Sequence, residues 1–451
     1  MESGYVGVGM GQIFSTNEKR LKDCFEYKDL VSVLSNKVLF SFGSGLSKKT
    51  VKFNKDKYLK AISSQIKQLK EKSKTSKEMT LYIDSGGFQC ACGYIPKNQL
   101  KDFVDIYAQF LVNEIDNYDY AFSLDLPPSD YLFDDWDEMY EFNKYSYYKL
   151  FVDLPENVRK KIILVKHFRT PSQLNVWHRL LEDENIIKGF NSNYWSIGGI
   201  VASSSGDQTI PYITYSIPIS DIVEYSLKHN KTQVNLHILG GCAYRDLFYY
   251  SLVKKYIKIK TNIDFEFTYD SSGIIKQIIL GRYINPITED GLIQKIFFTS
   301  DKMDYKINGK RTEDIVLDEM RKMLKYAKIE NVEIPDKIYL NGKLHPVLEA
   351  LLTTYQLYTF KKLKNFFDSF CDTLTEEDFD NEDIFKSKTY DILRKINGLK
   401  VTTKFKNKTN NLHRSILYVI QGNKEKNIKL IDYYTTKDEI KFGPKVAVDT
   451  F

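Results

Sequence analysis

The sequence predicts an α/β fold, with a (β/α)8 barrel of the TIM type over residues 1–300 and a mainly helical extension over residues 301–451 that ends in a small β element. Short β-prone apolar runs alternate with stretches of helical period, which is typical of βα units on a parallel sheet. Several of these runs end in Asp or Gly, the residue types expected where barrel strands open onto a catalytic rim. The alternation extends to about residue 285, close to the roughly 250 residues of such a barrel.

Seven apolar runs fit strands. They are Lys37–Ser41, Thr80–Asp84, Tyr120–Asp125, Lys161–Val165, Tyr194–Ile197, Val234–Leu239 and Phe265–Tyr269. Stretches of helical period separate them, at Lys57–Lys70, Gln99–Ile115, Asp134–Leu150, Ser172–Ile187, Ile219–Lys228 and Tyr244–Tyr256. A closed barrel needs an eighth strand, which the sequence pattern does not locate.

The alternation of predicted strands and helices does not continue beyond about residue 300. Amphipathic helices are predicted over Thr312–Ala327, Pro346–Phe367 and Ile384–Ile396. The basic, β-prone stretch Lys400–Asn411 and the strand-like runs Ser415–Gln421 and Ile428–Tyr434 follow. They predict the small β element at the end of the extension.

Composition excludes several classes of protein. Of 451 residues, 42% are hydrophobic and 27% charged, which is close to globular averages and excludes global disorder. No apolar run approaches the roughly 18 residues of a membrane span, and the first residues lack the pattern of a secretory signal. Five cysteines, an odd and sparse set, favour a reducing compartment, so we expect a cytoplasmic protein without a membrane partner. The net charge of +6 permits a polyanionic partner without requiring one.

The segment Asp84–Gln89, with the sequence DSGGFQ, carries the most specific chemical pattern. A carboxylate ends a strand, and two glycines then let the backbone approach a ligand closely. A planar, hydrogen-bonding ligand would suit the residues that follow, since Phe88 can stack on it and Gln89 can read its edge. The same residues also fit a plain β-turn that caps the next helix.

Two more carboxylates lie at the ends of predicted strands: Asp125 ends one, and Asp270 directly follows another. Asp270 is suited to attack an anomeric carbon while Asp84 manages protons, the two roles that glycosyl transfer requires. Asp125 precedes two prolines and can accept two N–H donors from a guanine-like edge. The glycines at 198 and 199 could expose backbone groups to a base. Each of these residues, taken alone, equally fits a turn or a helix cap.

Five short motifs together resemble the tRNA-guanine transglycosylase family, the superfamily of queuine and archaeosine tRNA-ribosyltransferases. In order and approximate spacing they are DSGGFQ at Asp84–Gln89, LD at Leu124–Asp125, IGGI at Ile197–Ile200, LGG at Leu239–Gly241 and YDSS at Tyr269–Ser272. That family consists of (β/α)8 barrels that exchange a guanine base in a polynucleotide for a 7-deazaguanine. The resemblance covers about residues 35–300.

The resemblance implies a role for each matching residue. Asp270 would be the nucleophile on C1′ of the target nucleotide, with Asp264, six residues upstream, as the alternative alignment. Asp84 would be the general acid and base. The base would be bound by a further set, namely Phe88, Gln89, Asp125, Gly198, Gly199 and Ile200. His167 occupies about the position of a pocket glutamine in the family, where it is either a pocket donor or an ordinary core or surface imidazole.

The chain departs from the family at the zinc site. The family builds this site as C-x-C-x-x-C with a later His, just beyond the barrel, whereas residues 296–343 contain no Cys. A structural zinc needs four N or S ligands, so no zinc and no other cofactor is expected. Cys90 and Cys92, with Cys242, make only a weak alternative metal site.

The missing zinc module makes the chain most similar to the bacterial and phage transglycosylases of 7-deazaguanine DNA modification. The expected reaction therefore inserts a preQ0-type 7-deazaguanine base into DNA, and tRNA is the alternative polynucleotide. Exchange in a duplex requires the target nucleotide to leave the stack, a step for which a duplex-opening partner is conceivable. Basic segments that could bind the backbone are Lys48–Lys60, Lys254–Lys260 and Lys400–Lys408, although each also fits a solvated surface.

Two other classes of function stay open at this point. The barrel could bind nucleic acid without turnover, or it could be a glycoside hydrolase with two carboxylates. The DSGGFQ segment argues against the hydrolase, because it suits a planar base. The sequence specifies neither the inserted base, nor the target context, nor the oligomeric state.

Overall fold

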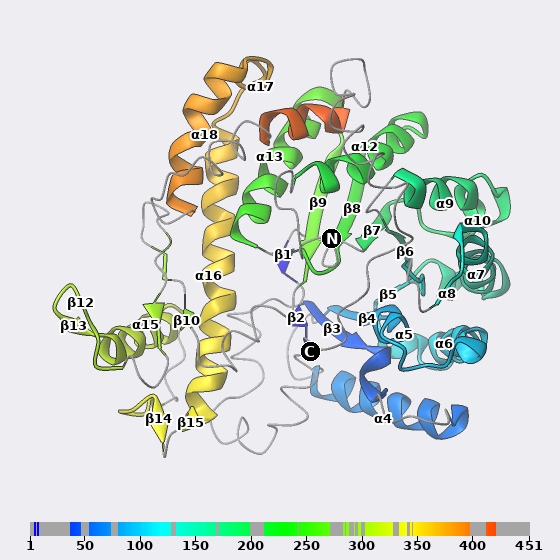
Figure 1. Ribbon diagram of the computed structural model, residues 1–451, viewed down its shortest axis with the longest axis horizontal. Helices are drawn as coiled ribbons and strands as arrows, with labels where there is room; N and C mark the ends of the chain where they lie inside the picture. Colours follow the sequence, from blue (N-terminus) through cyan, green and yellow to red (C-terminus); the bar gives the residue numbers. More distant parts are fainter. Residues whose placement is uncertain are drawn as a thin grey trace.

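The fold is seen in a computed structural model of the chain (Figure 1). It describes residues 4–5, 7–8, 37–46, 54–73, 80–127, 132–167, 171–198, 212–241, 243–270, 283–284, 286–287, 293, 296–298, 303–327, 333–340, 343–344, 346–396 and 412–420.

A curled parallel sheet forms the centre of the molecule and confirms the predicted α/β class (Figure 1). Its main strands are β3 (Lys37–Ser41), β4 (Thr80–Asp84), β5 (Tyr120–Phe122), β6 (Ile162–His167), β7 (Tyr194–Gly198), β8 (Gln233–Ile238) and β9 (Asp264–Tyr269). They pair in parallel and in chain order, so each connection crosses to the adjacent strand. Two short strands, β1 (Gly4–Tyr5) and β2 (Gly7–Val8), pair in parallel with β9 and β3 respectively.

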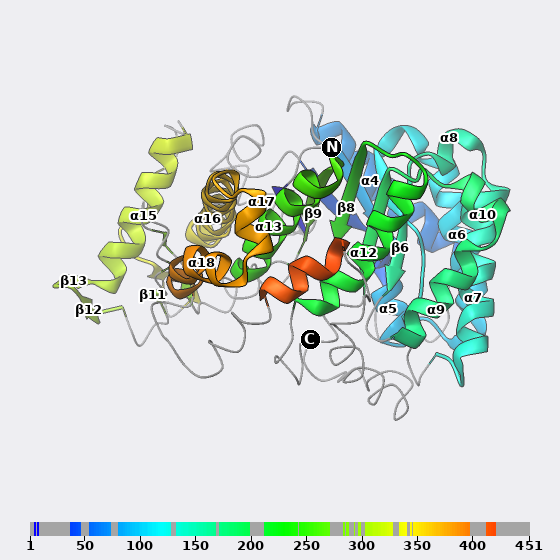
Figure 2. The same ribbon diagram turned by 90° about the horizontal axis from the view of Figure 1, so that it is seen from above.

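Helices connect the strands and lie on the outside of the curved sheet (Figure 2). They are α4 (Lys55–Ser73), α5 (Gly87–Ala91), α6 (Leu100–Asn113), α7 (Trp136–Tyr148), α8 (Glu156–Arg159), α9 (Pro171–Leu181), α10 (Glu184–Gly189), α12 (Ile213–Lys228) and α13 (Tyr244–Thr261). The single helix predicted over Ser172–Ile187 is two helices. Asp183 separates them, because its side chain accepts a hydrogen bond from the backbone N–H of Asn185 and so caps α10.

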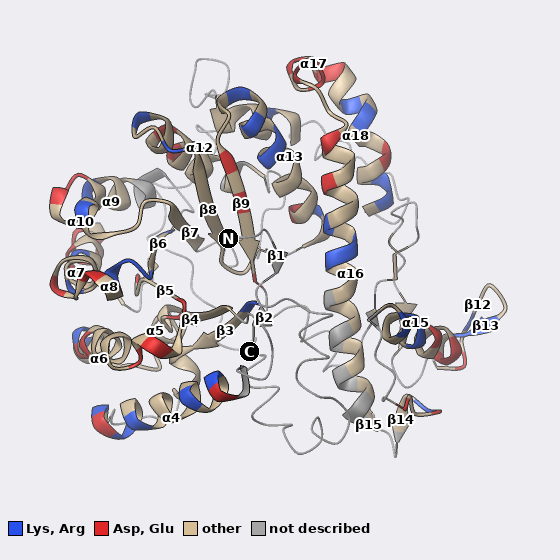
Figure 3. Cartoon of the chain, turned by 180° about the vertical axis from the view of Figure 1, so that it is seen from behind, with Lys and Arg blue, Asp and Glu red and all other residues tan. Residues whose placement is uncertain are grey.

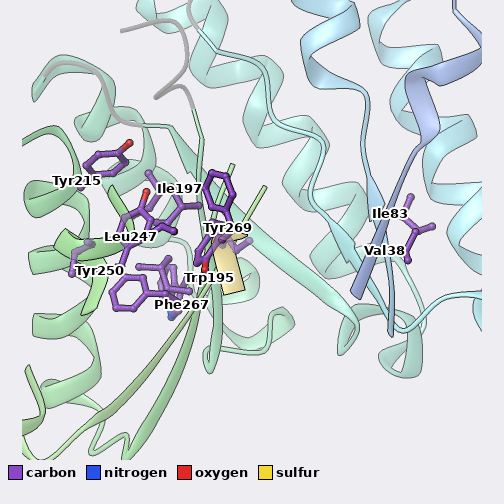
Figure 4. Close-up of a cluster of buried hydrophobic side chains, with 14 of the residues drawn as sticks. Val38, Ile83, Trp195, Ile197, Tyr215, Leu247, Tyr250, Phe267 and Tyr269 are labelled. Carbon is purple, nitrogen blue, oxygen red and sulfur yellow. The ribbon is translucent and has the colours of Figure 1, made fainter. Parts of the chain in front are cut away.

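Alternation along the strands divides the sheet into two faces. Outward side chains such as Phe267 pack against the helices, where Phe267 stacks on Tyr250 of α13 at 5.4 Å between ring centroids (Figure 4). A separate buried cluster consists of Leu39, Tyr82, Phe122, Ile163 and Val165. Because side chains alternate faces along a strand, Asp84 lies on the same inner face as Tyr82, and His167 on the same face as Val165.

Four further helices belong to the C-terminal part: α15 (Thr312–Ala327), α16 (Pro346–Asp372), α17 (Glu376–Asp380) and α18 (Glu382–Ile396). The long helix α16 packs along α13 (Figure 1). Phe248 and Phe367 meet there with ring centroids 5.0 Å apart, and Ser251 Oγ donates a hydrogen bond of 2.7 Å to Asp368. No helix among the described residues combines the length and apolar character that crossing a bilayer requires.

The predicted strand at Ser415–Gln421 is wrong, because residues 412–420 are helical. Leu412, Ile416 and Val419 are buried at helical spacing, so packing of one helical face outweighs the β-propensity of this apolar run. The stretches Lys400–Asn411 and Ile428–Tyr434 lie outside the described residues. The short hairpins after residue 300 instead precede α15 and α16, at β12 (Lys306–Ile307) with β13 (Lys310–Arg311), and at β14 (Tyr339–Leu340) with β15 (Lys343–Leu344).

Candidate active site

Asp84 is the last residue of β4, where the parallel sheet opens at its carboxyl edge. Ser41 lies opposite it on β3 and donates a hydrogen bond of 2.6 Å from Oγ to Asp84 Oδ2. Burial raises the pKa of the Asp84 carboxyl, and the charges of Asp270 and Asp125 raise it further, against the hydrogen bonds from Ser41 and the Gly86 N–H. The carboxyl is therefore suited to hold a proton and release it during a reaction.

Asp270 follows β9 at the same edge and is buried, with 8% of its surface exposed. Its Oδ1 accepts a hydrogen bond from the backbone N–H of Gly240 at 2.9 Å and lies 3.1 Å from His237 Nε2. Asp264, the alternative nucleophile, begins the same strand, is exposed and pairs with Lys258 at 2.9 Å. Of these two carboxylates, Asp270 is the one that shares an edge of the sheet with Asp84.

Asp125 follows β5 and is buried beside His167, the last residue of β6. His167 Nε2 contacts Asp125 Oδ2. Burial raises the pKa of Asp125, and the charge and hydrogen bond of His167 oppose this rise. The ring of His167 thus lies against the carboxylate that the sequence predicts as a base reader. This position is compatible with the predicted role of a pocket donor.

The glycines of the DSGGFQ segment bring it close to the other parts of the site. Gly86 adopts a left-handed φ of +82°, and a Cβ added to it would lie 2.8 Å from the Cα of Gly43. A Cβ on Gly87 would lie 2.7 Å from the backbone oxygen of Asp125. Only residues without a side chain permit these two approaches, so the segment joins the ends of β3, β4 and β5.

The two base-contacting residues predicted in this segment differ in exposure. Phe88 is 51% exposed, an orientation compatible with stacking on a ligand at the surface. Gln89 Oε1 is buried and has no hydrogen-bond partner among the described residues. His167 Nδ1 is likewise buried and without a hydrogen-bond partner in the described part of the chain. Buried polar atoms without partners cost free energy, so a ligand with its own polar groups could satisfy them.

Gly198 ends β7 next to His167 in the register of the sheet. A Cβ at this position would lie 2.8 Å from Cε1 of the imidazole, so the glycine leaves room for the ring. Gly199 and Ile200, the other predicted backbone contacts, lie outside the described residues.

Sequence reasoning missed His237 and Ser41. The signal for His237 is the alternation in β8, where Val234, Leu236 and Ile238 belong to the outer core and His237 therefore points inward. Ser41 could have been found in the same way, as the last residue of the strand that pairs with β4.

The described residues contain no cluster of three or more His, Cys, Asp or Glu that could hold a metal ion. Cys90 is buried and Cys92 half-buried, while Cys242 falls outside the described part of the chain. Burial raises the pKa of the Cys90 thiol, which disfavours the thiolate that binds metals.

The basic segment Lys254–Lys260 is largely paired with acidic groups. Lys254 pairs with Glu266 at 2.7 Å, and Lys260 lies within 2.7 Å of Glu376 and 2.9 Å of Asp380. Figure 3 shows basic positions of α13 and acidic positions of α17 in the same part of the molecule. The segment is therefore a weaker candidate for backbone binding than its sequence suggested. Within Lys48–Lys60, the part from Lys55 onward is described and forms the start of α4, whereas Lys400–Lys408 lies outside the described residues.

No protein-family model matches the chain, and no curated protein matches it either. A function must therefore be inferred from the chemistry of the site. Three carboxylates lie at one edge of a parallel sheet, and two of them have a histidine beside them: Asp125 contacts His167, and Asp270 contacts His237.

Proposed function

We propose that the chain is a base-exchange transglycosylase that replaces guanine in a polynucleotide, DNA in the first instance, with a preQ0-type 7-deazaguanine. The observation that carries this proposal is the contrast between Asp84 and Asp270 at one edge of the sheet. Burial and neighbouring charge favour a proton on Asp84. The Oδ1 atom of Asp270 accepts a hydrogen bond from the Gly240 N–H and contacts His237 Nε2, while no described residue donates a hydrogen bond to its Oδ2. An acid and a nucleophile at one edge of the sheet are what a double displacement needs.

The first half of the reaction forms a covalent intermediate. A lone pair of Asp270 makes a bond to C1′ of the target nucleotide, and the C1′–N9 bond breaks with its electron pair going to the departing guanine. Asp84 gives that guanine its proton and becomes a carboxylate.

The second half reverses these roles. Asp84 takes the N9 proton of the incoming 7-deazaguanine, whose N9 forms the new bond to C1′. The electron pair of the C1′–oxygen bond returns to Asp270. No net proton or electron is gained or lost over the two half-reactions.

Asp125 and Gln89 are the proposed base readers. The carboxylate of Asp125 can accept the N1–H and the 2-amino group that guanine and 7-deazaguanines share. His167 lies against one oxygen of that carboxylate, which would hold its orientation. Gln89 Oε1 offers a further buried acceptor, and the exposed ring of Phe88 offers a stacking surface.

A closed (β/α)8 barrel is part of the proposal. The short strands β1 and β2 are separated by a single residue, and they pair with β9 and β3, the outermost of the seven main strands. One continuous N-terminal segment would therefore serve as the missing eighth strand. Closure would bring the ends of β3 and β9 together. Asp84, which ends β4 beside β3, and Asp270, which follows β9, would then lie around the same open end of the barrel.

DNA is preferred to tRNA because the sequence lacks the C-x-C-x-x-C zinc module of the tRNA enzymes that it resembles. The two substrates differ in the 2′-hydroxyl beside the attacked C1′. In either case the target base must leave the stack before Asp270 can reach C1′.

The test is release of radiolabelled guanine from DNA and from tRNA on addition of a 7-deazaguanine base. We expect release from DNA, loss of release in Asp270→Asn, and full release in Asp264→Asn, a matched control on the same strand. Release from tRNA alone would replace DNA by tRNA as the substrate. Release that survives Asp270→Asn would refute the nucleophile, and no release from either polymer would contradict the proposed function.

A further inference from the structure

We propose that His237 is a positioning residue that holds one oxygen of Asp270 and leaves the other to attack. The catalytic part of this inference rests on the proposed function. Its structural part concerns which nitrogen of His237 carries a proton and which oxygen of Asp270 is free, and it can be measured without turnover.

Two N–H donors converge on the same oxygen of Asp270. Gly240 N–H reaches Oδ1 at 2.9 Å and His237 Nε2 reaches it at 3.1 Å, whereas no described residue donates a hydrogen bond to Oδ2. A carboxylate held twice through one oxygen cannot rotate without losing both bonds. Oδ2 is therefore the oxygen available to form the bond to C1′.

The hydrogen bonds define the tautomer of His237. An ionised carboxylate oxygen can only accept, so the proton in the contact between Oδ1 and His237 must come from Nε2. The other ring nitrogen, Nδ1, lies 2.9 Å from Thr268 Oγ1. In a neutral imidazole with Nε2–H, the threonine hydroxyl donates to Nδ1 and so holds the ring in this tautomer.

Packing holds the plane of the ring. His237 is only 1% exposed, and its centroid lies 4.6 Å from that of Phe122 and 6.3 Å from that of Tyr82. Thr268 lies two residues before Asp270, so alternation along the strand puts both side chains on the inner face. Thr268 and the inward-pointing His237 together hold the Oδ1 atom of Asp270 in place, an arrangement that we call the holding device.

The device acts at both chemical steps. When Oδ2 bonds to C1′, Oδ1 becomes the carbonyl oxygen of the glycosyl ester and keeps both N–H donors. When the ester breaks, the electron pair returns to the carboxylate and the same donors stabilise its charge. Loss of the His237 donor should therefore slow the second step, in which charge returns to Asp270, and slow the first step through loss of the orientation of the carboxylate. The expected size is about 10–100-fold, the range for one hydrogen bond to a charged group.

Two substitutions separate positioning from structural support. His237→Gln keeps an N–H donor near the position of Nε2, whereas His237→Leu fills the space without a donor. We expect kcat to fall by about 10–100-fold in His237→Leu, with the KM for the incoming base unchanged, and His237→Gln to restore most of the loss. Equal loss of kcat in both variants, or a rise in KM that accounts for the effect, would overturn the proposal.

A spectroscopic measurement on the full chain does not depend on activity. Selective ¹⁵N-histidine labelling reports the tautomer of each of the six histidines, and the resonance of His237 is the one lost in His237→Gln. We expect the Nε2–H tautomer, with a proton shift that changes in Asp270→Asn but not in Asp264→Asn. An Nδ1–H tautomer, or a shift insensitive to Asp270→Asn, would refute the inference. The expected spectrum in a wild-type protein that exchanges no base would instead refute the proposed function and leave the positioning intact.

Discussion

Ser41 Oγ donates a hydrogen bond of 2.6 Å to Asp84 Oδ2 across neighbouring strands of the sheet. This bond stabilises the ionised carboxylate and so lowers the pKa of Asp84. Burial, Asp270 and Asp125 all act in the opposite direction. Ser41 thus limits how strongly Asp84 holds its proton, which matters for a group that must first give a proton and then take one back.

Removing the hydroxyl in Ser41→Ala should raise the pKa of Asp84 further. The first half-reaction needs protonated Asp84, so its rate should persist to higher pH than in the wild type. The second half-reaction needs the carboxylate, so its loss at low pH should also begin at a higher pH. Single-turnover rates of each half-reaction across pH would measure both limbs of the pH profile, namely the loss of the first half-reaction at high pH and of the second at low pH.

Ser196→Ala is the matched control for this experiment. Ser196 is also a buried strand serine, but its Oγ has no hydrogen-bond partner among the described residues. Its substitution should leave both pH limbs in place. Limbs that move in opposite directions in Ser41→Ala would contradict the assignment of one acid–base residue to both half-reactions.

Asp84→Asn should stabilise the fold at neutral pH while it strongly slows exchange. Because the pKa of Asp84 is raised in the folded protein, the folded state binds its proton more tightly than the unfolded state does. The wild type therefore loses stability as pH rises from the ordinary Asp value of about 3.9 through the folded value. Asparagine does not titrate and can still accept from Ser41.

The expected gain at pH 7 is about 0.5–2 kcal/mol in the free energy of unfolding, the usual size for a stabilising substitution. Urea unfolding of both proteins at pH 7 and near pH 4 would measure it, and the gain should shrink at the lower pH. Activity should fall by about 10²–10⁴-fold, as expected for loss of a general acid–base group. A variant less stable than the wild type at pH 7 would show that burial of the Asp84 charge is not costly.

Gly198→Ala should disturb base binding through His167. The added Cβ would lie 2.8 Å from Cε1 and 3.0 Å from Nε2 of the imidazole, a separation that forces one of them to move. The ring is only 8% exposed, so its displacement should break the contact with Asp125. We expect about 10-fold or more loss in affinity for guanine, the effect of one hydrogen bond to a charged group, measured by calorimetry.

A double-mutant cycle checks the route of this effect. In a His167→Ala background the added methyl group has no ring to displace, so Gly198→Ala should then change affinity little. Equal effects in both backgrounds would mean that the methyl group acts on the ligand or the backbone instead.

Much of the sheet and three of its carboxylates were predictable from the sequence. Thr80–Asp84 matches β4 residue for residue, since a β-prone run bounded by polar and glycine residues marks a buried parallel strand. Asp84, Asp125 and Asp270 stood out because each follows such a run. Their hydrogen-bond partners were not predictable, because Ser41 and His237 come from other strands and depend on register.

Two features of the structure could not be predicted from the local sequence, because they depend on residues far away in the chain. The run Ser415–Gln421 has strand-like composition, yet this part of the chain is helical and buries one face, which depends on its neighbours. The lysines of Lys254–Lys260 looked available for phosphate. The partners of Lys260, Glu376 and Asp380, lie more than a hundred residues away in the chain, so only the fold brings them together.

The pairing of these lysines leads to a final prediction about polynucleotide binding. Lys258 and Lys260 already lie 2.9 Å or less from carboxylates, so Lys258→Ala and Lys260→Ala should leave the salt dependence of binding unchanged. Lys60 of α4 is exposed and forms no ion pair with a described residue, which makes Lys60→Ala the comparison for a site that can bind phosphate. Each lysine that contacts a phosphate contributes about 1 to the slope of log K against log salt concentration.

Fluorescence anisotropy with labelled DNA at several salt concentrations would measure these slopes. We expect a decrease of about 1 for Lys60→Ala and none for the two α13 variants. A decrease in the α13 variants would mean that DNA displaces the carboxylates from these lysines, Asp264 from Lys258, and Glu376 and Asp380 from Lys260. The polynucleotide would then bind beside α13 and not beside α4. No decrease in any of the three would exclude Lys60, Lys258 and Lys260 as phosphate contacts, because a lysine that neutralises a phosphate releases counterions from the DNA.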